Sequence, residues 1–190
     1  IPDLLVDRKL RRNKKYNNTT EVYNDFKDEK LIENKGGNYS YSNLGYIFLG
    51  ALIEKVTNMD YIDYITLKIL KPLKMNNTGF GKINITPYTS KGKKLTKNFY
   101  NERTFASSGG GLKSTAGDFI KFKNFYKLLT PETLKSLPET LKFYYNKDED
   151  KLFNITANGS IEGGAAYFKI KYDNNWKYKD LKIHFLTVIN

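Results

Sequence analysis

The residues best suited to chemistry gather in the stretch YSYSNLGY, residues 39–46. The chain has no cysteine and one histidine, His184, so any hydrolytic reaction must use Ser, Tyr, Lys and carboxylate side chains. Tyr41 and Asn43 lie two positions apart, and in a non-helical turn this spacing lets both side chains face one cleft. A phenol serves as a general base only where positive charge stabilises its phenolate. The alternative interpretation is that these residues only cap a helix.

The segment after Asn43 is predicted to be the helix that positions this stretch. Apolar side chains recur there at the three-and-four spacing of a buried helix face: Leu44, Ile47, Phe48, Ala51, Leu52 and Val56. Glu54 and Lys55 are predicted to face outward, and Ser42 or Asn43 to cap the helix N-terminus. The candidate residues would therefore lie at the start of an amphipathic helix.

A second helix is predicted to begin at Asp60, which would cap it. It must end near Lys71, because Pro72 disfavours helical conformation at the residue before it. Upstream, the apolar pattern around residues 21–33 is weak and predicts only short helical turns. The lysine-rich stretch 76–104 is predicted to be mostly loop.

The glycine run 109–111 predicts a turn. A phosphate cradle is disfavoured there, because no Lys-Ser or Lys-Thr pair follows at the spacing of a P-loop. A third helix should follow, with Ser114 or Thr115 as its cap and Asp118 in a capping-box position. A short fourth helix is predicted from residues 130–131, a Thr-Pro pair.

From residue 142 the pattern changes to alternating aromatic and polar side chains, which predicts antiparallel strands separated by turns. The predicted strands are residues 142–146, 151–156, 165–172 and 176–190. His184 falls in the last of them and is interpreted as structural. Helices followed by a strand meander indicate an α+β fold, an antiparallel β-sheet with packed helices. The length favours a single domain over residues 1–190.

The charge balance is strongly basic, with a formal net charge of +12. Such a charge would suit nucleic acid or an anionic cell-wall polymer. However, the 28 Lys are scattered and there are only four Arg, the residue type that recognises phosphates bidentately. Only residues 7–15 form a dense basic cluster. A solvated basic surface is therefore favoured over a nucleic-acid site.

No stretch of about 18 consecutive apolar residues occurs, so no transmembrane segment is predicted. The N-terminus, IPDLLVDRKL, lacks the charged and then apolar pattern of a signal peptide. Because the chain starts at Ile, we expect it to continue something longer. The single histidine and absent cysteines call for no metal and no cofactor.

Three stretches in order resemble the serine β-lactamase and D-Ala-D-Ala carboxypeptidase family, especially its class C and esterase-like branch. Residues 41–80, YSNLGYIFLGALIEKVTNMDYIDYITLKILKPLKMNNTGF, resemble the family's Tyr-x-Asn motif, its helix and its PLGM-x-x-T segment. Residues 107–122, SSGGGLKSTAGDFIKF, resemble its glycine turn and STA-x-D helix. Residues 156–168, TANGSIEGGAAYF, give a weaker match to a cleft strand. The resemblance implies an incomplete β-lactamase/transpeptidase-like fold.

The resemblance implies an acyl-enzyme mechanism, in which a serine attacks an amide or ester carbonyl with help from a lysine and the motif tyrosine. Tyr41 matches that tyrosine, whereas Tyr39 lacks an asparagine two positions later. Asn43 matches the asparagine that, in the family, contacts the substrate amide and orders the lysine. The implied substrates are a D-alanyl peptide, a β-lactam or a small ester.

The chain departs from the family at the nucleophile. The family's Ser-x-x-Lys precedes the tyrosine motif, but no serine before Tyr41 has lysine at plus three. The start, IPDLL, resembles residues just after the family's HTSG turn, so we expect the chain to begin downstream of the nucleophile. Ser90 and Lys93 form the one Ser-x-x-Lys pair, which we reject because it follows the tyrosine motif in a polar loop.

The third family motif, Lys-Thr-Gly or His-x-Gly on a cleft strand, aligns best with Ala157, Asn158 and Gly159. Ala157 replaces the cationic residue that would lower the tyrosine's pKa and hold a substrate carboxylate. Gly159 is retained, and Ser160 follows where the family's strand offers a backbone N–H to the oxyanion.

The sequence therefore predicts a β-lactamase-related serine hydrolase, present as a fragment that is inactive alone. Its partners would be a small-molecule or peptidoglycan-peptide substrate and the missing N-terminal segment. The resemblance implies a bacterial source and a periplasmic or extracellular location. Two alternatives remain: a non-catalytic pseudoenzyme, or a basic binding module for an anionic cell-wall polymer or nucleic acid.

Overall fold

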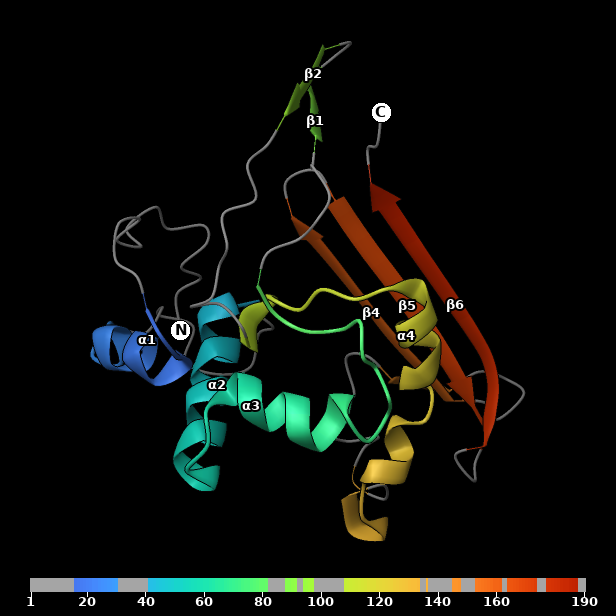
Figure 1. The fold of residues 1–190 in the computed structure, drawn as a ribbon, viewed down its shortest axis with the longest axis horizontal. Helices are drawn as coiled ribbons and strands as arrows, with labels where there is room; N and C mark the ends of the chain where they lie inside the picture. The colour runs from blue at the N-terminus through green and yellow to red at the C-terminus, as the bar shows by residue number, and fades with distance from the viewer. Residues whose placement is uncertain are drawn as a thin grey trace. The chain divides into compact units, whose positions relative to one another are not determined.

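The computed structural model describes most of the chain, and its elements are drawn in Figure 1. The described residues are 16–30, 41–81, 88–91, 94–97, 108–133, 136, 145–147, 153–161, 164–173 and 177–187. They fall into two compact units. The first contains residues up to Leu70 with the segments Thr78–Lys82 and Glu102–Lys113, and the second contains the remainder. The expectation of a single domain stays a prediction.

The first unit is helical, and its helices begin where capping side chains predict. Its elements are α1 (Thr19–Phe26), α2 (Asn43–Thr57), α3 (Tyr61–Ile65) and the π-helix η1 (Thr66–Leu70). Ser42 caps α2 and Asp60 caps α3, which confirms two predicted caps. Helical structure ends at Leu70, as the proline at 72 requires. The core of the unit consists of Tyr16, Val22, Phe26, Leu44 and Ile47.

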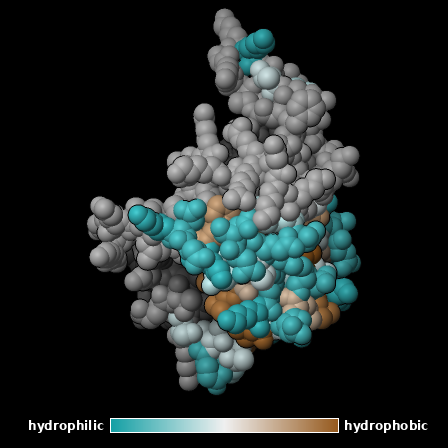
Figure 2. All heavy atoms as spheres, turned by 90° about the vertical axis from the view of Figure 1, so that its left-hand side faces the viewer, coloured by the Kyte–Doolittle hydropathy of each residue, from teal (hydrophilic) through white to brown (hydrophobic). Residues whose placement is uncertain are grey.

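One face of α2 differs from its prediction. Leu44, Ile47 and Ala51 are buried as expected, but Leu52 is 53% exposed and Val56 is 76% exposed. Figure 2 shows hydrophobic patches between hydrophilic side chains on one face of the molecule. The buried stripe continues instead to Glu54, which is 9% exposed. The outward orientation predicted for Glu54 is therefore wrong.

Glu54 is buried because its carboxylate accepts hydrogen bonds from the starts of two helices. The backbone N–H groups of Thr19 and Thr20 donate to it over 3.2 and 2.8 Å, and the Thr20 hydroxyl donates as well. The N–H of Tyr61 donates over 3.2 Å. Burial alone would raise the pKa of Glu54, but these hydrogen bonds outweigh it and hold the pKa below its usual value of 4.5. Glu54 thus joins α1 and α3 through helix N-termini that need acceptors.

The second unit contains a four-stranded antiparallel sheet in the order β3-β4-β5-β6. Its strands are β3 (Tyr145–Lys147), β4 (Phe153–Ile161), β5 (Gly164–Tyr172) and β6 (Tyr178–Thr187). The helix α4 (Ala116–Phe122) lies across one face of this sheet in Figure 1, and the 3-10 helix η3 (Phe125–Leu128) follows it. Strands and helices together confirm the predicted α+β class.

Aromatic side chains form the core between α4, η3 and the sheet. Ile170 and Tyr172 are fully buried there. The side chains packed against them are Phe122, Phe125, Tyr126, Phe168, Tyr178 and Leu181. The Tyr172 hydroxyl donates to the Lys123 carbonyl over 2.7 Å, so its polar end is satisfied inside this core. Alternate residues of β5 thus face α4, which explains the period-two pattern of the sequence.

A β-hairpin was not predicted. Strands β1 (Tyr88–Lys91) and β2 (Lys94–Lys97) pair in antiparallel register within the stretch expected to be loop. Lys91 pairs with Lys94, so only Gly92 and Lys93 connect the strands, and a glycine in a two-residue connection is typical of tight hairpins. The alternation of polar residues gave no apolar face to signal these strands.

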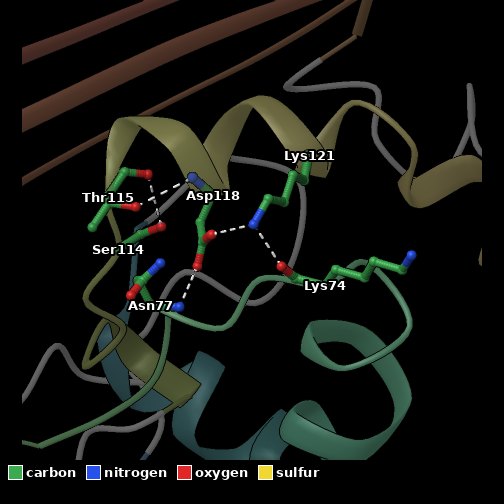
Figure 3. Close-up of polar contacts among 6 residues, drawn as sticks. All are labelled: Lys74, Asn77, Ser114, Thr115, Asp118 and Lys121. Atoms are coloured by element: carbon green, nitrogen blue, oxygen red, sulfur yellow. Dashed lines mark hydrogen bonds and ion pairs between the residues drawn. The ribbon is translucent and has the colours of Figure 1, made fainter.

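Asp118 joins α4 to the turn before residue 78, as Figure 3 shows. Its N–H donates to the Thr115 hydroxyl over 3.2 Å, which confirms Thr115 as the helix cap. The Asp118 carboxylate, 1% exposed, accepts from the Asn77 N–H at 2.5 Å and pairs with Lys121 at 2.7 Å. Lys121 also donates to the Lys74 carbonyl over 2.6 Å. We call these contacts the Asp118 clamp.

Lys74 lies in the left-handed region, with a φ of 57°, within this clamped turn. The PLGM segment that this stretch resembles has glycine at the corresponding position. Left-handed backbone costs a residue with a Cβ roughly 1–2 kcal/mol, and glycine avoids most of that cost.

Replacing Lys74 with glycine is therefore expected to raise the free energy of unfolding by about 1 kcal/mol, because the Lys74 carbonyl that Lys121 uses is retained. Urea unfolding followed by circular dichroism measures the change. Lys71→Gly is the matched control, since Lys71 has no positive φ, and it should lose about 0.5–1 kcal/mol. A stability loss in Lys74→Gly equal to that of the control would contradict this account of the turn.

Candidate active site

Tyr41 and Asn43 come together at the N-terminus of α2. The Tyr41 hydroxyl donates a hydrogen bond to Asn43 Oδ1 over 3.2 Å. Tyr41 is 51% exposed, whereas Asn43, the first residue of α2, is 9% exposed. The buried amide therefore orients a phenol whose ring remains accessible from solvent.

Ser42 forms the helix cap between these two residues. Its backbone is extended, and its hydroxyl accepts from the Gly45 N–H over 3.1 Å. Capping and a functional role are thus not alternatives here, because the cap uses Ser42 and leaves the Tyr41 and Asn43 side chains to contact one another.

The predicted glycine turn lies against the start of α2. A Cβ at Gly109 would come within 3.3 Å of the Asn43 carbonyl oxygen, so glycine permits this close approach. Gly110 has a φ of 134°, which requires glycine. Beyond the turn, Gly79 and Lys113 exchange two backbone hydrogen bonds of 3.0 and 2.8 Å. The turn prediction is confirmed, and the structure brings this second motif to the tyrosine motif.

A further close contact holds the same segments together at Gly50. A Cβ added there would lie 2.3 Å from Ser108 Oγ and 3.1 Å from Thr19 Cγ2. The hydroxyls of Thr19 and Ser108 are both buried and have no hydrogen-bond partner among the described residues. The start of α1, the middle of α2 and the glycine turn therefore meet at a point where no larger side chain fits.

The predicted cleft-strand residues lie within β4. The register pairs Ala157 with Phe168 and Gly159 with Ala166 of β5. Asn158 and Ser160 alternate with them, at positions opposite Tyr167 and Ala165. On its other side β4 pairs with β3 only along Phe153, Asn154 and Ile155.

Among the described strands, residues 156–161 of β4 are therefore paired on one side only. An unpaired edge leaves backbone N–H groups available to other acceptors. Because Tyr41 and Asn43 belong to the first unit and β4 to the second, the convergence of these motifs on one site stays a prediction.

The remaining sequence candidates have separate outcomes. Ser90 lies in strand β1, opposite Leu95, and not at the start of a helix, which agrees with its rejection as a nucleophile. His184 lies in β6 and is exposed, with its ring edge-on to Tyr167 at 5.7 Å. Tyr39 and the basic cluster 7–15 lie outside the described residues.

Within the described part of the chain, no three His, Asp or Glu side chains gather in a way that could hold a metal ion. No helix in that part is both long and apolar enough to cross a membrane.

The structural roles of two carboxylate residues, Glu54 and Asp118, were not predicted from the sequence. Glu54 falls on the buried stripe 44, 47, 51, 54 of α2, so its spacing did carry a signal. The Asp118 carboxylate was assigned only to a helix cap, and nothing local in the sequence indicates its contact with Asn77, 41 positions away. Glu54 joins α2 to the starts of α1 and α3, and Asp118 joins α4 to the turn at Asn77.

The family model described as Beta-lactamase matches residues 2–153. That match covers most of the chain and includes both the tyrosine motif and the glycine turn. The chain therefore belongs to the β-lactamase family of serine hydrolases and penicillin-binding proteins.

Individual relatives resemble the chain over shorter stretches or at lower sequence identity. The human serine beta-lactamase-like protein LACTB, mitochondrial, is 31% identical over 118 residues, which are 58% of this chain and 21% of that protein. FmtA from Staphylococcus aureus aligns with a TM-score of 0.68 and 22% identity, covering 92% of this chain and 53% of the FmtA chain. D-amino acid amidase from Ochrobactrum anthropi SV3 aligns with a TM-score of 0.67 and 18% identity, covering 96% and 60%.

These structural likenesses show a shared fold, the incomplete β-lactamase/transpeptidase-like fold that the sequence predicted. The chain spans about a fifth of the length of LACTB and about half of FmtA.

Proposed function

We propose that the chain carries the tyrosine part of an acyl-transfer site for a D-alanyl peptide, a β-lactam or a small ester. The observation that carries the proposal is the Tyr41 hydroxyl bonded to the buried Asn43 side chain at the start of α2. Tyr41 passes a proton between an attacking serine and the leaving group, and Asn43 contacts the substrate amide. The backbone N–H of Ser160 in β4 stabilises the oxyanion.

The proposal assigns no nucleophile to these 190 residues. The one serine before Tyr41, Ser40, is followed at plus three by Asn43 and not by lysine. No acyl-enzyme forms without a serine and its lysine, because the members of such a site act as a unit. The chain is therefore inactive alone and gains activity when a Ser-x-x-Lys segment associates with it.

The substrate class rests on the family and on one structural neighbour. The family description is Beta-lactamase, and a neighbour of similar fold is a D-amino acid amidase. Both names point to attack on an amide carbonyl. A periplasmic or extracellular location in a bacterium is part of the proposal. The human relative LACTB, in contrast, is described as mitochondrial.

A second candidate function is a non-catalytic pseudoenzyme. Ala157 favours it, because this position of the strand motif carries a cation in the family and carries a methyl group here. Without that cation the phenolate of Tyr41 loses a stabilising charge.

A fluorescent penicillin distinguishes these functions by intact mass. The purified 190-residue chain is expected to form no covalent adduct. A chimera in which a family member's Ser-x-x-Lys segment precedes the chain is expected to be acylated. Tyr41→Phe in the chimera should slow acylation by about 10²–10⁴-fold, the usual size of general acid–base catalysis.

Tyr64→Phe is the matched control, because Tyr64 lies in α3 and is not part of the Tyr-x-Asn motif. It should leave acylation unchanged. A folded chimera that forms no adduct would favour the pseudoenzyme. An adduct on the 190-residue chain itself, mapped to Ser90 or another serine, would overturn the assignment of the nucleophile to a separate segment.

A further inference from the structure

The outward face of β5 and β6 carries charge and aromatic rings in an ordered pattern. Phe168, Ile170 and Tyr172 of β5 face the core under α4 and η3. Because side chains alternate along a strand, Tyr167, Lys169 and Lys171 lie on the opposite face of the sheet. The same reasoning applies to β6, where Leu181 packs in the core and Lys182 is exposed.

The strand register arranges this face in three rows. Tyr167 lies opposite His184, Lys169 opposite Lys182, and Lys171 opposite Asp180. On the β4 side, Thr156 extends the row of Lys169. The two lysines of the middle row are therefore direct cross-strand neighbours, and a row of two rings lies next to them.

Opposed lysines weaken a sheet, because like charges directly across an antiparallel pair repel. Neither Lys169 nor Lys182 forms an ion pair with any residue that the structure describes. Among the described residues of this face, the one acid is Asp180, which lies in the next row opposite Lys171. A solvated sheet face needs polar side chains, but it does not need two cations at one paired position. Lys169 and Lys182 therefore leave positive charge available to an external anion.

We propose that this face binds single-stranded nucleic acid. Rows two residues apart along a strand are separated by roughly 7 Å, so one nucleotide covers both rows. Its phosphate contacts Lys169 and Lys182, and its base lies against the rings of Tyr167 and His184. Cationic side chains beside aromatic rings on an antiparallel sheet form the general arrangement for holding unpaired bases.

The ring row favours a nucleic acid over a phosphate polymer without bases. Lysines alone would serve any polyanion, but Tyr167 and His184 add ring faces on which a base can stack. The sequence disfavoured nucleic acid because its lysines are scattered. The register gathers Lys169 and Lys182, which are distant in the sequence, at one position. This inference uses β5 and β6 alone and does not depend on the proposed acyl-transfer site.

Fluorescence anisotropy with a labelled 12-nucleotide oligouridylate, titrated with the purified chain at several salt concentrations, tests the proposal. The double variant Lys169→Gln/Lys182→Gln should weaken binding about tenfold at low salt. It should also reduce the slope of log affinity against log salt by about 1.4, since each single-strand phosphate contact contributes about 0.7. The charge-matched control is Lys55→Gln/Lys68→Gln, two exposed lysines of α2 and η1.

Removing a ring tests the base contact separately. Tyr167→Leu should weaken oligouridylate binding about fivefold or more and leave the salt slope unchanged. His184→Ala, which removes an exposed ring, should also weaken binding and leave the salt slope unchanged. This second variant keeps the test decisive if Tyr167→Leu does not fold. If both lysine double variants lost the same amount of affinity, the proposal would be overturned, because diffuse positive charge would then explain the binding. It would also be overturned if inorganic polyphosphate of equal phosphate number bound as tightly and both ring variants bound normally.

Discussion

Replacing Glu54 with alanine is expected to lower the free energy of unfolding by about 4 kcal/mol, and replacement with glutamine by about 2 kcal/mol. The alanine variant leaves the N–H groups of Thr19, Thr20 and Tyr61, which are buried or partly buried, without their acceptor. Glutamine keeps one acceptor oxygen but lacks the charge that favours helix N-termini. Urea unfolding followed by circular dichroism at neutral pH measures both losses.

The Glu54 contribution should also depend on pH in a defined direction. The folded pKa lies below the usual 4.5, so the unfolded chain takes up the proton first as pH falls. The stabilisation is therefore complete above about pH 4.5 and is lost as pH falls through the folded pKa. The stability difference between the native chain and Glu54→Gln should shrink below pH 4.5.

Glu29→Gln is the matched control, because Glu29 is exposed in the bend that follows α1. It should change stability by less than about 0.5 kcal/mol. If Glu54→Gln behaved like this control at neutral pH, the buried acceptor would have no measurable role in stability.

Replacing Asp118 with alanine should have the second large effect, lowering the free energy of unfolding by about 3 kcal/mol. The change removes the acceptor of the Asn77 N–H and the partner of Lys121 at once. Because the Lys121 side chain is 40% exposed, the unpaired ammonium can reach water, and the loss stays below that of a fully buried pair. Hydrogen exchange at the Asn77 amide should become faster in the variant.

Asp173→Asn provides the comparison for this second effect. Its ion pair with Lys179 is 3.2 Å long and more exposed, so its loss should cost less than about 1 kcal/mol. Similar losses for Asp118→Ala and Asp173→Asn would show that burial of the Asp118 clamp adds nothing.

Local contacts were predictable from the sequence, and distant polar contacts were not. Ser42, Asp60 and Thr115 cap helices because hydroxyl and carboxylate side chains reach N–H groups only two or three residues away. The strands from residue 142 onward were predictable because one face is aromatic and the other polar.

The Tyr41–Asn43 contact was predictable for the same reason, since it spans two residues. Glu54 and Asp118 instead bind backbone groups that lie 34 to 41 residues away, and no periodicity reports such partners. The spacing of apolar side chains predicts which helix face is buried, but not that a carboxylate also lies on that face.

The hairpin β1–β2 was missed because neither strand has an apolar face. Its residues were assigned to loop by their lysine content, which is a correlation and not a mechanism. The two-residue connection containing Gly92 was the available signal. The functional assignment depended on motif resemblance, because pattern reasoning predicts elements but not the chemistry of a site.

The order of strands in the second unit has a consequence for how this unit folds. Each of β4, β5 and β6 pairs with the strand just before it, so the sheet can form by successive hairpins without closing a long loop. The Asp118 contact with Asn77 closes 41 residues and gains nothing until α4 and the turn have both formed. We therefore expect the clamp to form after the folding transition state. Losing it should mainly speed unfolding and leave the refolding rate nearly unchanged.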